Sequence, residues 1–324
     1  MPDPKEGTTT TFAAGGSVGE AVIGGAIQVG AADRALSTRE LAWRRFKRHH
    51  LAMASSILLV LVALAAVLVP LFYKFNYHQT FTAGALVAPF PHSGPSLKHL
   101  FGVDEIGRDY FIRVIYGGRI SLMVGFSVAI SAGVIGALVG SLAGYYGGWI
   151  DNSLMRVTDL FLAMPFLVIL IVASTVLHGS VFDIVLILSL FFWMPDARIV
   201  RGLFLSLKEK EFVEAAKSSG ATNKRIIFNH ILPNTLGPIT VNVTLGVAAA
   251  ILTESALSFL GFGVQPPVPT WGNLLNEAQP MTQVSPYLTW FPGLFILLTV
   301  LCVNFLGDGL RDALDPHQKI GVAV

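Results

Sequence analysis

The chain has 324 residues, of which 53% are hydrophobic and 13% are charged, and its mean hydropathy is +0.65. A soluble globular chain carries about 25% charged residues, so much of the usual polar surface is missing. Lipid is therefore the expected solvent for most of the chain. The single cysteine, Cys302, excludes a disulfide framework and a four-cysteine metal site. The net charge of +2 says little about partners.

The N-terminal region, residues 1–50, is predicted to form a cytosolic tail. Its first 32 residues are rich in Gly, Ala and Thr, and we expect them to be disordered. They lack a continuous apolar core with basic flanks, so no cleavable signal peptide is apparent. A weak surface helix near residues 18–29 is the alternative interpretation.

Six apolar stretches follow, and each approaches the roughly 20 residues that a helix needs to cross the hydrocarbon. They are residues 51–73, 120–146, 155–177, 181–200, 236–257 and 287–306. We therefore predict an all-α membrane protein with six transmembrane helices. An extracytoplasmic segment, residues 74–118, would follow the first helix, and a five-helix core, residues 119–307, would precede a cytosolic tail, residues 308–324. The fourth stretch is expected to stop at Pro195.

The distribution of basic residues predicts the orientation. If both termini are cytoplasmic, 17 of the 22 Lys and Arg residues fall in cytosolic segments. The other five lie between the first two helices. The clusters Arg44–Arg45 and Lys47–Arg48, just before the first helix, are the strongest local signal. The positive-inside rule therefore favours both ends in the cytosol.

Small residues form two rows on the second predicted helix. One row is Gly136, Gly140 and Gly144, at four-residue spacing, and an adjoining row contains Ser121, Gly125, Ala129 and Gly133. Small residues let two membrane helices approach closely. The sequence therefore predicts close helix packing, with a partner helix in the same chain or in another.

A polar segment, residues 203–235, separates the fourth and fifth apolar stretches and is predicted to form a cytosolic helical hairpin. Ser206 and Glu209 have the spacing of a capping box, which would start a helix running through residues 211–219. Gly220 is placed to end that helix. A second helix is expected from about Thr222, and Pro233 is expected to limit its extent.

The first helix of this hairpin carries a face of small side chains, Ala215, Ala216 and Ser219. Such a face suits insertion into a groove on another protein. A short amphipathic helix that lies on the lipid headgroups is the alternative.

The hairpin also carries a motif. Glu214-Ala215-Ala216, then Gly220, then Leu232-Pro233 resembles the EAA loop of ATP-binding-cassette importer permeases. In that family the loop is the coupling helix, which docks in a cleft of the cytosolic ATPase. His230 stands where the general pattern has isoleucine, and this resembles the peptide-importer branch.

Four further segments resemble the C-type permeases of the dipeptide and oligopeptide importers. They are residues 99–109, 116–122, 257–272 and 304–316. Within the first, Phe101 and Val103 stand where the family has leucine and threonine. The motifs occur in the expected order and span about residues 99–316, so the first 50 residues fall outside the resemblance.

This resemblance implies the fold of a type I importer membrane domain and a location in the cell's inner membrane. It further implies a homologous second permease, two ATP-binding-cassette ATPase subunits and an extracytoplasmic peptide-binding protein as partners. The coupling residues would be Glu214, Ala215, Ala216, Gly220, Leu232 and Pro233. No cofactor, metal or nucleic acid is expected.

The loop after the fifth helix, Gly263–Pro286, contains five prolines, no basic residue and Trp271. Thr270 is expected to cap a short helix through residues 274–278. A stiff outer loop is a candidate surface for a soluble partner, with Gly263, Pro266, Pro267 and Trp271 as its candidate residues. A passive lid is the alternative.

Ionisable and amide groups inside membrane helices need partners. We expect Asp159 to pair with Arg156 on the same helix. Glu254 is expected near the outer end of its helix, within reach of water. Asn242 and Asn304 are expected to form hydrogen bonds between helices.

The chain contains no G-x-x-x-x-G-K-[ST] phosphate loop, so the transport energy must come from another polypeptide. A non-catalytic transport subunit is therefore the main hypothesis. An ion-coupled carrier is the rival, although no internal repeat is evident. An intramembrane hydrolase is disfavoured because its motifs are absent. Relatives of the family branch carry nickel complexes, glutathione or sugars, which remain alternatives to peptides.

Overall fold

The computed structural model describes residues 38–74, 76–79, 94–177 and 179–315. The chain divides into two units, residues 1–41 and residues 42–324. The described part of the first unit is the start of a helix at residues 38–41. The predicted disorder of residues 1–32 lies outside the described residues.

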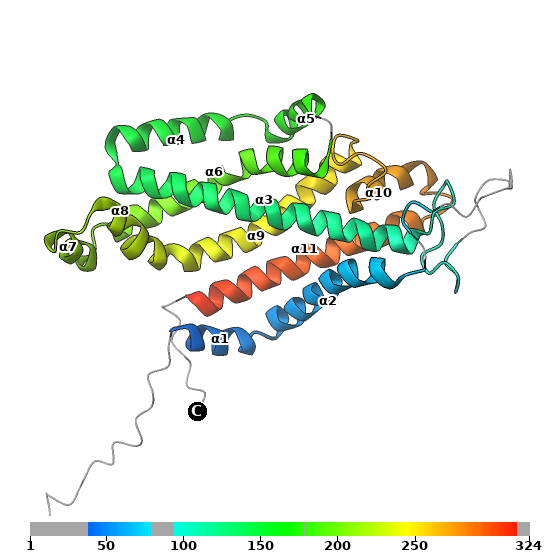
Figure 1. The fold of residues 1–324 in the computed structure, drawn as a ribbon, viewed down its shortest axis with the longest axis horizontal. Coiled ribbons are helices and arrows are strands. Elements are labelled where there is room, and N and C mark those ends of the chain that lie inside the picture. Colours follow the sequence, from blue (N-terminus) through cyan, green and yellow to red (C-terminus); the bar gives the residue numbers. More distant parts are fainter. Residues whose placement is uncertain (1–37, 75, 80–93, 178, 316–324) are drawn as a thin grey trace, which may run out of the picture. The chain divides into compact units, whose positions relative to one another are not determined.

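The described residues are helical, with no β-strand beyond an isolated bridge between Val103 and Asp109. The prediction of an all-α membrane protein is thus confirmed. The longer elements are α1 (Thr38–Arg48), α2 (His50–Phe72), α3 (Tyr110–Tyr146), α4 (Gly148–Leu162), α5 (Phe166–Val176), α6 (Val181–Leu207), α9 (Leu232–Phe259) and α11 (Tyr287–Leu314) (Figure 1). The shorter ones are α7 (Glu211–Ser218), α8 (Asn223–Arg225), η1 (Ile226–Ile231), α10 (Trp271–Ala278) and η2 (Gln279–Met281).

Four described helices are long and apolar enough to cross a membrane: α2, α3, the continuous helix over residues 223–259, and α11. The pair α4 and α5 is bent by 88° at a short break and makes a fifth crossing if it counts as one span. The sixth predicted crossing, α6, falls short because charged residues interrupt its apolar run at Asp183, Asp196 and Arg198. The predicted count of six is therefore not confirmed.

One predicted boundary is wrong, and one helix extends beyond its predicted apolar stretch. Helix α6 continues through Pro195 to Leu207, because a proline inside a helix removes one backbone hydrogen bond and neighbouring helices can support the rest. Helix α3 begins at Tyr110, well before residue 120. The side chain of Asp109 starts it by accepting a hydrogen bond from the backbone N–H of Ile112 at 3.1 Å.

The two rows of small residues on α3 place this helix between α6 and α9, as Figure 1 shows. A Cβ atom added at Gly140 would lie 2.9 Å from the backbone nitrogen of Arg201 on α6. A Cβ at Gly125, in the adjoining row, would lie 2.5 Å from Ile251 on α9. Both partner helices therefore belong to the same chain.

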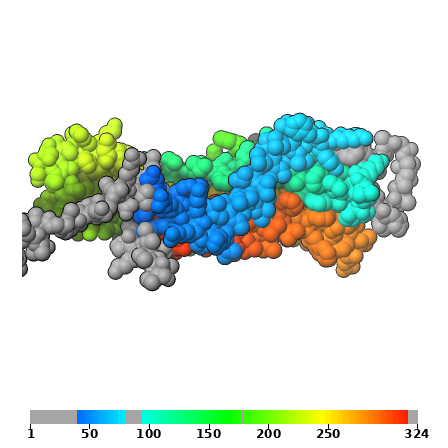
Figure 2. All heavy atoms as spheres, turned by 90° about the horizontal axis from the view of Figure 1, so that it is seen from below, coloured from blue at the N-terminus to red at the C-terminus, as the bar shows by residue number. Residues whose placement is uncertain are grey.

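Helix α2 packs against α11 and α3. Figure 2 shows α2 in blue along one face, with the orange-red α11 beside it. Many of its apolar side chains remain exposed, including Ile57, Leu61 and Leu64. This exposure is what a helix in contact with lipid requires.

Candidate functional site

The hairpin that follows α6 begins differently from the prediction. Ser206 lies inside α6, which ends at Leu207, so the predicted capping box with Glu209 is absent. Helix α7 instead begins at Glu211, after Lys210, whose extended backbone turns the chain without a side-chain cap. The capping-box prediction failed because α6 continues past Pro195 and includes the serine.

The turn between the two arms of the hairpin is built around Gly220. Its φ is +78°, a left-handed conformation that strongly favours glycine. The backbone N–H of Ala221 then donates to the carbonyl of Ala216 at 3.0 Å, which closes the end of α7. Thr222 starts the second arm, as predicted, by accepting a hydrogen bond from the backbone N–H of Arg225 at 3.4 Å.

The second arm does not stop at Pro233, so that prediction is wrong. Helix α8, the π-helical turn η1 and α9 form one continuous helix over residues 223–259. In the π-helical turn the N–H of Leu232 donates to the carbonyl of Ile227, five residues earlier. Pro233 has no N–H to donate. The wider turn before it keeps the helix continuous.

The two arms of the hairpin pack on a small apolar cluster. Val213 of α7 is fully buried against Phe204 of α6 and three isoleucines of η1. Ala216 and Leu232 are half-buried against the same cluster. Ala215, in contrast, is exposed. The predicted face of small side chains is therefore split between the inside and the outside of the hairpin.

The outward side of α7 presents Phe212, Glu214 and Ala215, all of which are exposed. Pro233 is exposed on the neighbouring arm. This combination of a phenylalanine, a carboxylate and a methyl group forms an amphipathic surface on a short helix that points away from the rest of the chain.

A second group of side chains joins the start of α3 to α10. We call Asp104, Arg108, Arg113 and Glu277 the outer clasp. The Arg113 side chain is only 1% exposed, and its Nη1 donates at 2.6 Å to both Asp104 Oδ2 and Glu277 Oε2. Arg108 Nε donates to Asp104 Oδ2 at 2.6 Å. Two guanidinium groups and two carboxylates thus neutralise one another.

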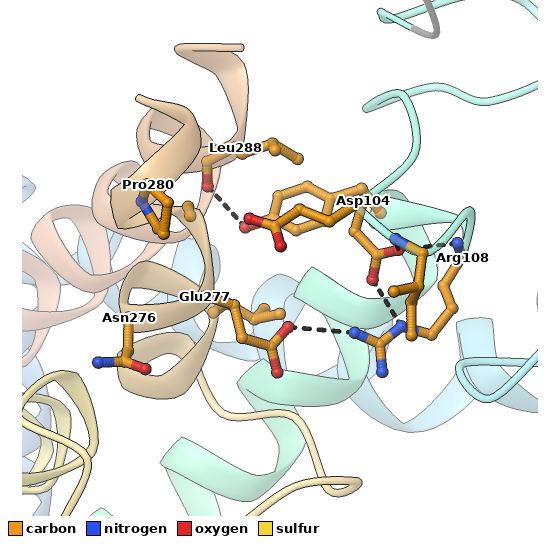
Figure 3. Close-up of a pocket in the computed structure, with 11 residues that line it drawn as sticks. Asp104, Arg108, Asn276, Glu277, Pro280 and Leu288 are labelled. Atoms are coloured by element: carbon orange, nitrogen blue, oxygen red, sulfur yellow. Dashed lines mark hydrogen bonds and ion pairs between the residues drawn. The ribbon is translucent and has the colours of Figure 1, made fainter. Parts of the chain in front are cut away.

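Three members of the clasp line a cavity of about 300 Å³, and Figure 3 shows Arg108 in contact with both Asp104 and Glu277. Asn276 and Pro280 also line the cavity. The ion pairs join elements that are far apart in sequence, so they fix the short helix α10 on the start of the long helix α3.

The loop before α3 is shaped by its own acidic side chains. Asp104 Oδ1 accepts hydrogen bonds from the backbone N–H groups of Ile106 and Arg108, at 3.1 and 2.8 Å. Asp109 Oδ2 lies 2.8 Å from His99 Nδ1. Burial, and then the charge of Asp109, raises the pKa of the Tyr73 hydroxyl. Both acidic residues lie in the segment of residues 99–109 that resembles the family, and their joint role was not predicted from the sequence.

Helix α10 forms as predicted. The Thr270 hydroxyl accepts a hydrogen bond from the backbone N–H of Asn273 at 3.2 Å, and the Asn273 side-chain oxygen accepts one from the backbone N–H of Thr270 at 2.7 Å. Trp271 is fully buried, and its indole N–H donates to the carbonyl of Val114 at 3.0 Å.

The four candidate partner-facing residues of the outer loop lie in two environments. Gly263 and Trp271 are buried, whereas Pro266 and Pro267 are exposed. The exposed proline pair is the part of this set that another protein can reach.

Glu254 is fully buried, so the prediction that it reaches water is wrong. Its Oε1 accepts a hydrogen bond from Ser258 at 2.7 Å, and its Oε2 accepts one from Ser121 of α3 at 3.3 Å. The Ser121 hydroxyl in turn accepts the backbone N–H of Trp271 at 3.2 Å. A polar pocket among α3, α9 and α10 therefore surrounds the carboxyl group.

The partner predicted for Asp159 is also wrong. Its carboxylate pairs with Arg198 of α6 at 2.5 Å rather than with Arg156 one turn away. Asn242 of α9 donates a hydrogen bond to Asp196 of α6, so the expected bond between helices is confirmed for Asn242.

Comparison with known proteins places these features in one family. Residues 136–320 match the family model described as the binding-protein-dependent transport system inner membrane component. Residues 37–91 match the N-terminal transmembrane domain of oligopeptide transport permease C.

Characterised relatives are similar over most of their length. The oligopeptide transport system permease protein OppC of Escherichia coli is 46% identical, over 86% of this chain and 91% of that protein. The dipeptide transport system permease protein DppC of Alkalihalophilus pseudofirmus is 41% identical, over 88% of this chain and 92% of that protein. The glutathione transport system permease protein GsiD of Shigella boydii is 42% identical, over 86% of this chain and 90% of that protein. The chain therefore belongs to the family of binding-protein-dependent transport system inner membrane components, as a multi-pass permease subunit of an ATP-binding-cassette importer.

Proposed function

We propose that this permease imports di- or oligopeptides, forming the translocation path together with a homologous second permease. The observation that carries the proposal is the match to an N-terminal domain of the oligopeptide permease C type. It is supported by 46% and 41% identity with an oligopeptide and a dipeptide permease.

Two separate ATPase subunits supply the energy, and one of them docks on the cytosolic hairpin of this chain. The exposed side of α7, with Glu214 and Ala215, is the surface that enters the cleft of the ATPase. Gly220 provides the tight turn that brings the second arm back toward the membrane. Ala216 and Leu232 act from the inside, because they pack on the hairpin's own cluster and keep its shape. The permease itself is not an enzyme.

An extracytoplasmic peptide-binding protein delivers the substrate to the opposite end of the permease. The exposed Pro266 and Pro267 contribute to the surface that receives it. This arrangement requires both termini to be cytoplasmic in a lipid bilayer, and 17 of 22 basic residues on the cytosolic side favour it.

Glutathione is a second candidate substrate. The specific observation in its favour is 42% identity with a glutathione permease over 86% of the chain. Glutathione is itself a small peptide, so both candidates need a path for a flexible molecule with charged groups.

The experiment is uptake by the assembled transporter. The chain is affinity-purified from its own organism, and the co-purifying permease, ATPases and binding protein are identified. The set is then reconstituted in vesicles and given ATP with a labelled dipeptide, a labelled pentapeptide or labelled glutathione. ATP-dependent accumulation of either peptide supports the proposal. Accumulation of glutathione alone would favour glutathione as the substrate. Accumulation of none of the three compounds refutes both candidate substrates.

A further inference from the structure

Helix α4 is held to the rest of the permease by few contacts. Along Gly148–Leu162 the buried residues are Asp151 and Thr158. The chain enters this helix through Gly147 and Gly148, which both have positive φ, +66° and +54°. A Cβ atom at either glycine would meet nothing within 4 Å. Packing at this corner therefore does little to fix the direction of α4.

An ion pair supplies an attachment close to that corner. Arg201 of α6 donates from Nε to Asp151 Oδ1 at 2.5 Å and from Nη2 to Asp151 Oδ2 at 2.6 Å. The two parallel hydrogen bonds fix the angle between the groups as well as their distance. The Asp151 side chain is 12% exposed and that of Arg201 is 35% exposed, so the pair is largely shielded.

The backbone of Arg201 is itself fixed against α3. Cβ atoms at Gly140 and Gly144 would lie 2.9 Å from its nitrogen and 2.8 Å from its carbonyl oxygen. The helices are therefore in direct backbone contact at this residue. Arg201 thus joins three helices: its backbone packs on α3, its side chain holds α4, and it belongs to α6.

The same stretch of α6 holds the coupling hairpin. Phe204, one turn beyond Arg201, is fully buried and packs with Val213 of α7. A second link is the hydrogen bond from the Tyr145 hydroxyl, at the end of α3, to Asn223 at 2.8 Å. The Asp151–Arg201 ion pair therefore lies one helical turn from Phe204, the residue of α6 that packs on α7.

We propose that the Asp151–Arg201 ion pair is the positioning element that makes α4 move together with the hairpin formed by α7, α8 and η1. This inference rests on the proposed docking of the ATPase on α7. Without the ion pair, α4 keeps a glycine corner and few buried contacts. A movement of the hairpin would then no longer be transmitted to α4.

The chain contains a matched comparison between the same two helices. Asp159 of α4 pairs with Arg198 of α6 at 2.5 Å, but its side chain is 60% exposed and that of Arg198 is 50% exposed. Exposed ion pairs contribute little. If shielding from solvent and the two parallel hydrogen bonds matter, removing the charge of Asp151 or Arg201 should affect transport more than removing that of Asp159 or Arg198.

The test uses the complete transporter reconstituted in vesicles. Arg201→Gln and Asp151→Asn remove the ion pair, and the double variant D151R/R201D restores it with reversed charges. Arg198→Gln and Asp159→Asn are the controls. The readouts are the amount of assembled complex, ATP hydrolysis, and the number of peptides imported per ATP hydrolysed.

We expect Arg201→Gln and Asp151→Asn to lower the number of peptides imported per ATP by tenfold or more in the assembled complex. The reversed pair should recover at least a third of the parent value, and the control variants should stay within twofold. A merely structural role would reduce the amount of complex but leave peptides per ATP unchanged, and that result overturns the inference. So does a loss that the reversed pair does not rescue. If the parent transporter imports no peptide, it is the proposed function that fails.

Discussion

The proposed docking of the hairpin on an ATPase can be tested with two adjacent alanines. Ala215 is exposed on α7, whereas Ala216 is half-buried against the cluster around Val213. Tryptophan at residue 215 should change the stability of the permease by at most about 0.5 kcal/mol, because surface substitutions rarely cost more. Tryptophan at residue 216 must displace packed side chains, which typically costs about 1–3 kcal/mol.

The two variants should therefore fail for different reasons. Ala215→Trp should insert in the membrane and keep the parent's thermal stability, but the amount of ATPase that co-purifies with it should fall at least tenfold. This fall corresponds to about 1.4 kcal/mol of docking free energy. Ala216→Trp should also lower the thermal stability of the isolated permease. Ala215→Ser, which adds a single oxygen, is the control and should behave like the parent.

The assay is co-purification of the ATPase, followed by substrate-stimulated ATP hydrolysis and peptide uptake. Gly220→Val adds an independent probe, because a β-branched residue at φ +78° is strained by about 1–3 kcal/mol. Assembly and transport at the parent rate by Ala215→Trp would show that the exposed side of α7 does not dock. The assignment of the coupling element would then be wrong.

Four further predictions concern the membrane part and its partners. Gly140→Leu should destabilise the permease by at least about 1–3 kcal/mol in thermal denaturation, whereas Gly202→Leu, on an open face of α6, should have no such effect. Glu277→Gln should cost about 1.5–3 kcal/mol, because buried Arg113 of the outer clasp loses one charged hydrogen-bond partner while Asp104 stays in place, and an unchanged melting temperature would contradict this. An impermeant thiol reagent should label a cysteine at Pro267 in intact cells but one at Lys217 only after lysis, and the reverse pattern would invert the topology. The purified chain alone should neither hydrolyse ATP nor accumulate peptide, so gradient-driven uptake by it would favour a carrier.

Features set by a few neighbouring residues were predictable from the sequence. The turn at Gly220 follows from the need for a positive φ after a helix, and the cap at Thr270 follows from its hydroxyl and the residues after it. The close packing of the row formed by Gly136, Gly140 and Gly144 was also predictable from the sequence, although the partner helix was not. That partner, α6, is identified by contacts between residues about 60 positions apart in the chain.

Features set by distant contacts were not predictable. Glu254 looked like a group near water, yet serines from α3 and α9 surround it. Asp159 had a basic neighbour one turn away, but the three-dimensional structure brings Arg198 closer. Trp271 lies in a loop rich in proline, where exposure is the default expectation, and the outer clasp beside it could be seen only once α10 was placed on α3. In each case at least one of the partners lies on another element.

The buried carboxyl group of Glu254 also bears on how the protein is made. A ribosome synthesises α3 before α9, so Ser121 is available before Glu254 emerges. A charged side chain inserted alone into hydrocarbon costs a few kcal/mol. A hydrogen-bond donor already present on α3, the Ser121 hydroxyl, would lower that cost during insertion. The order of the helices in the chain thus matches an assembly sequence in which an earlier helix receives a later, more polar one.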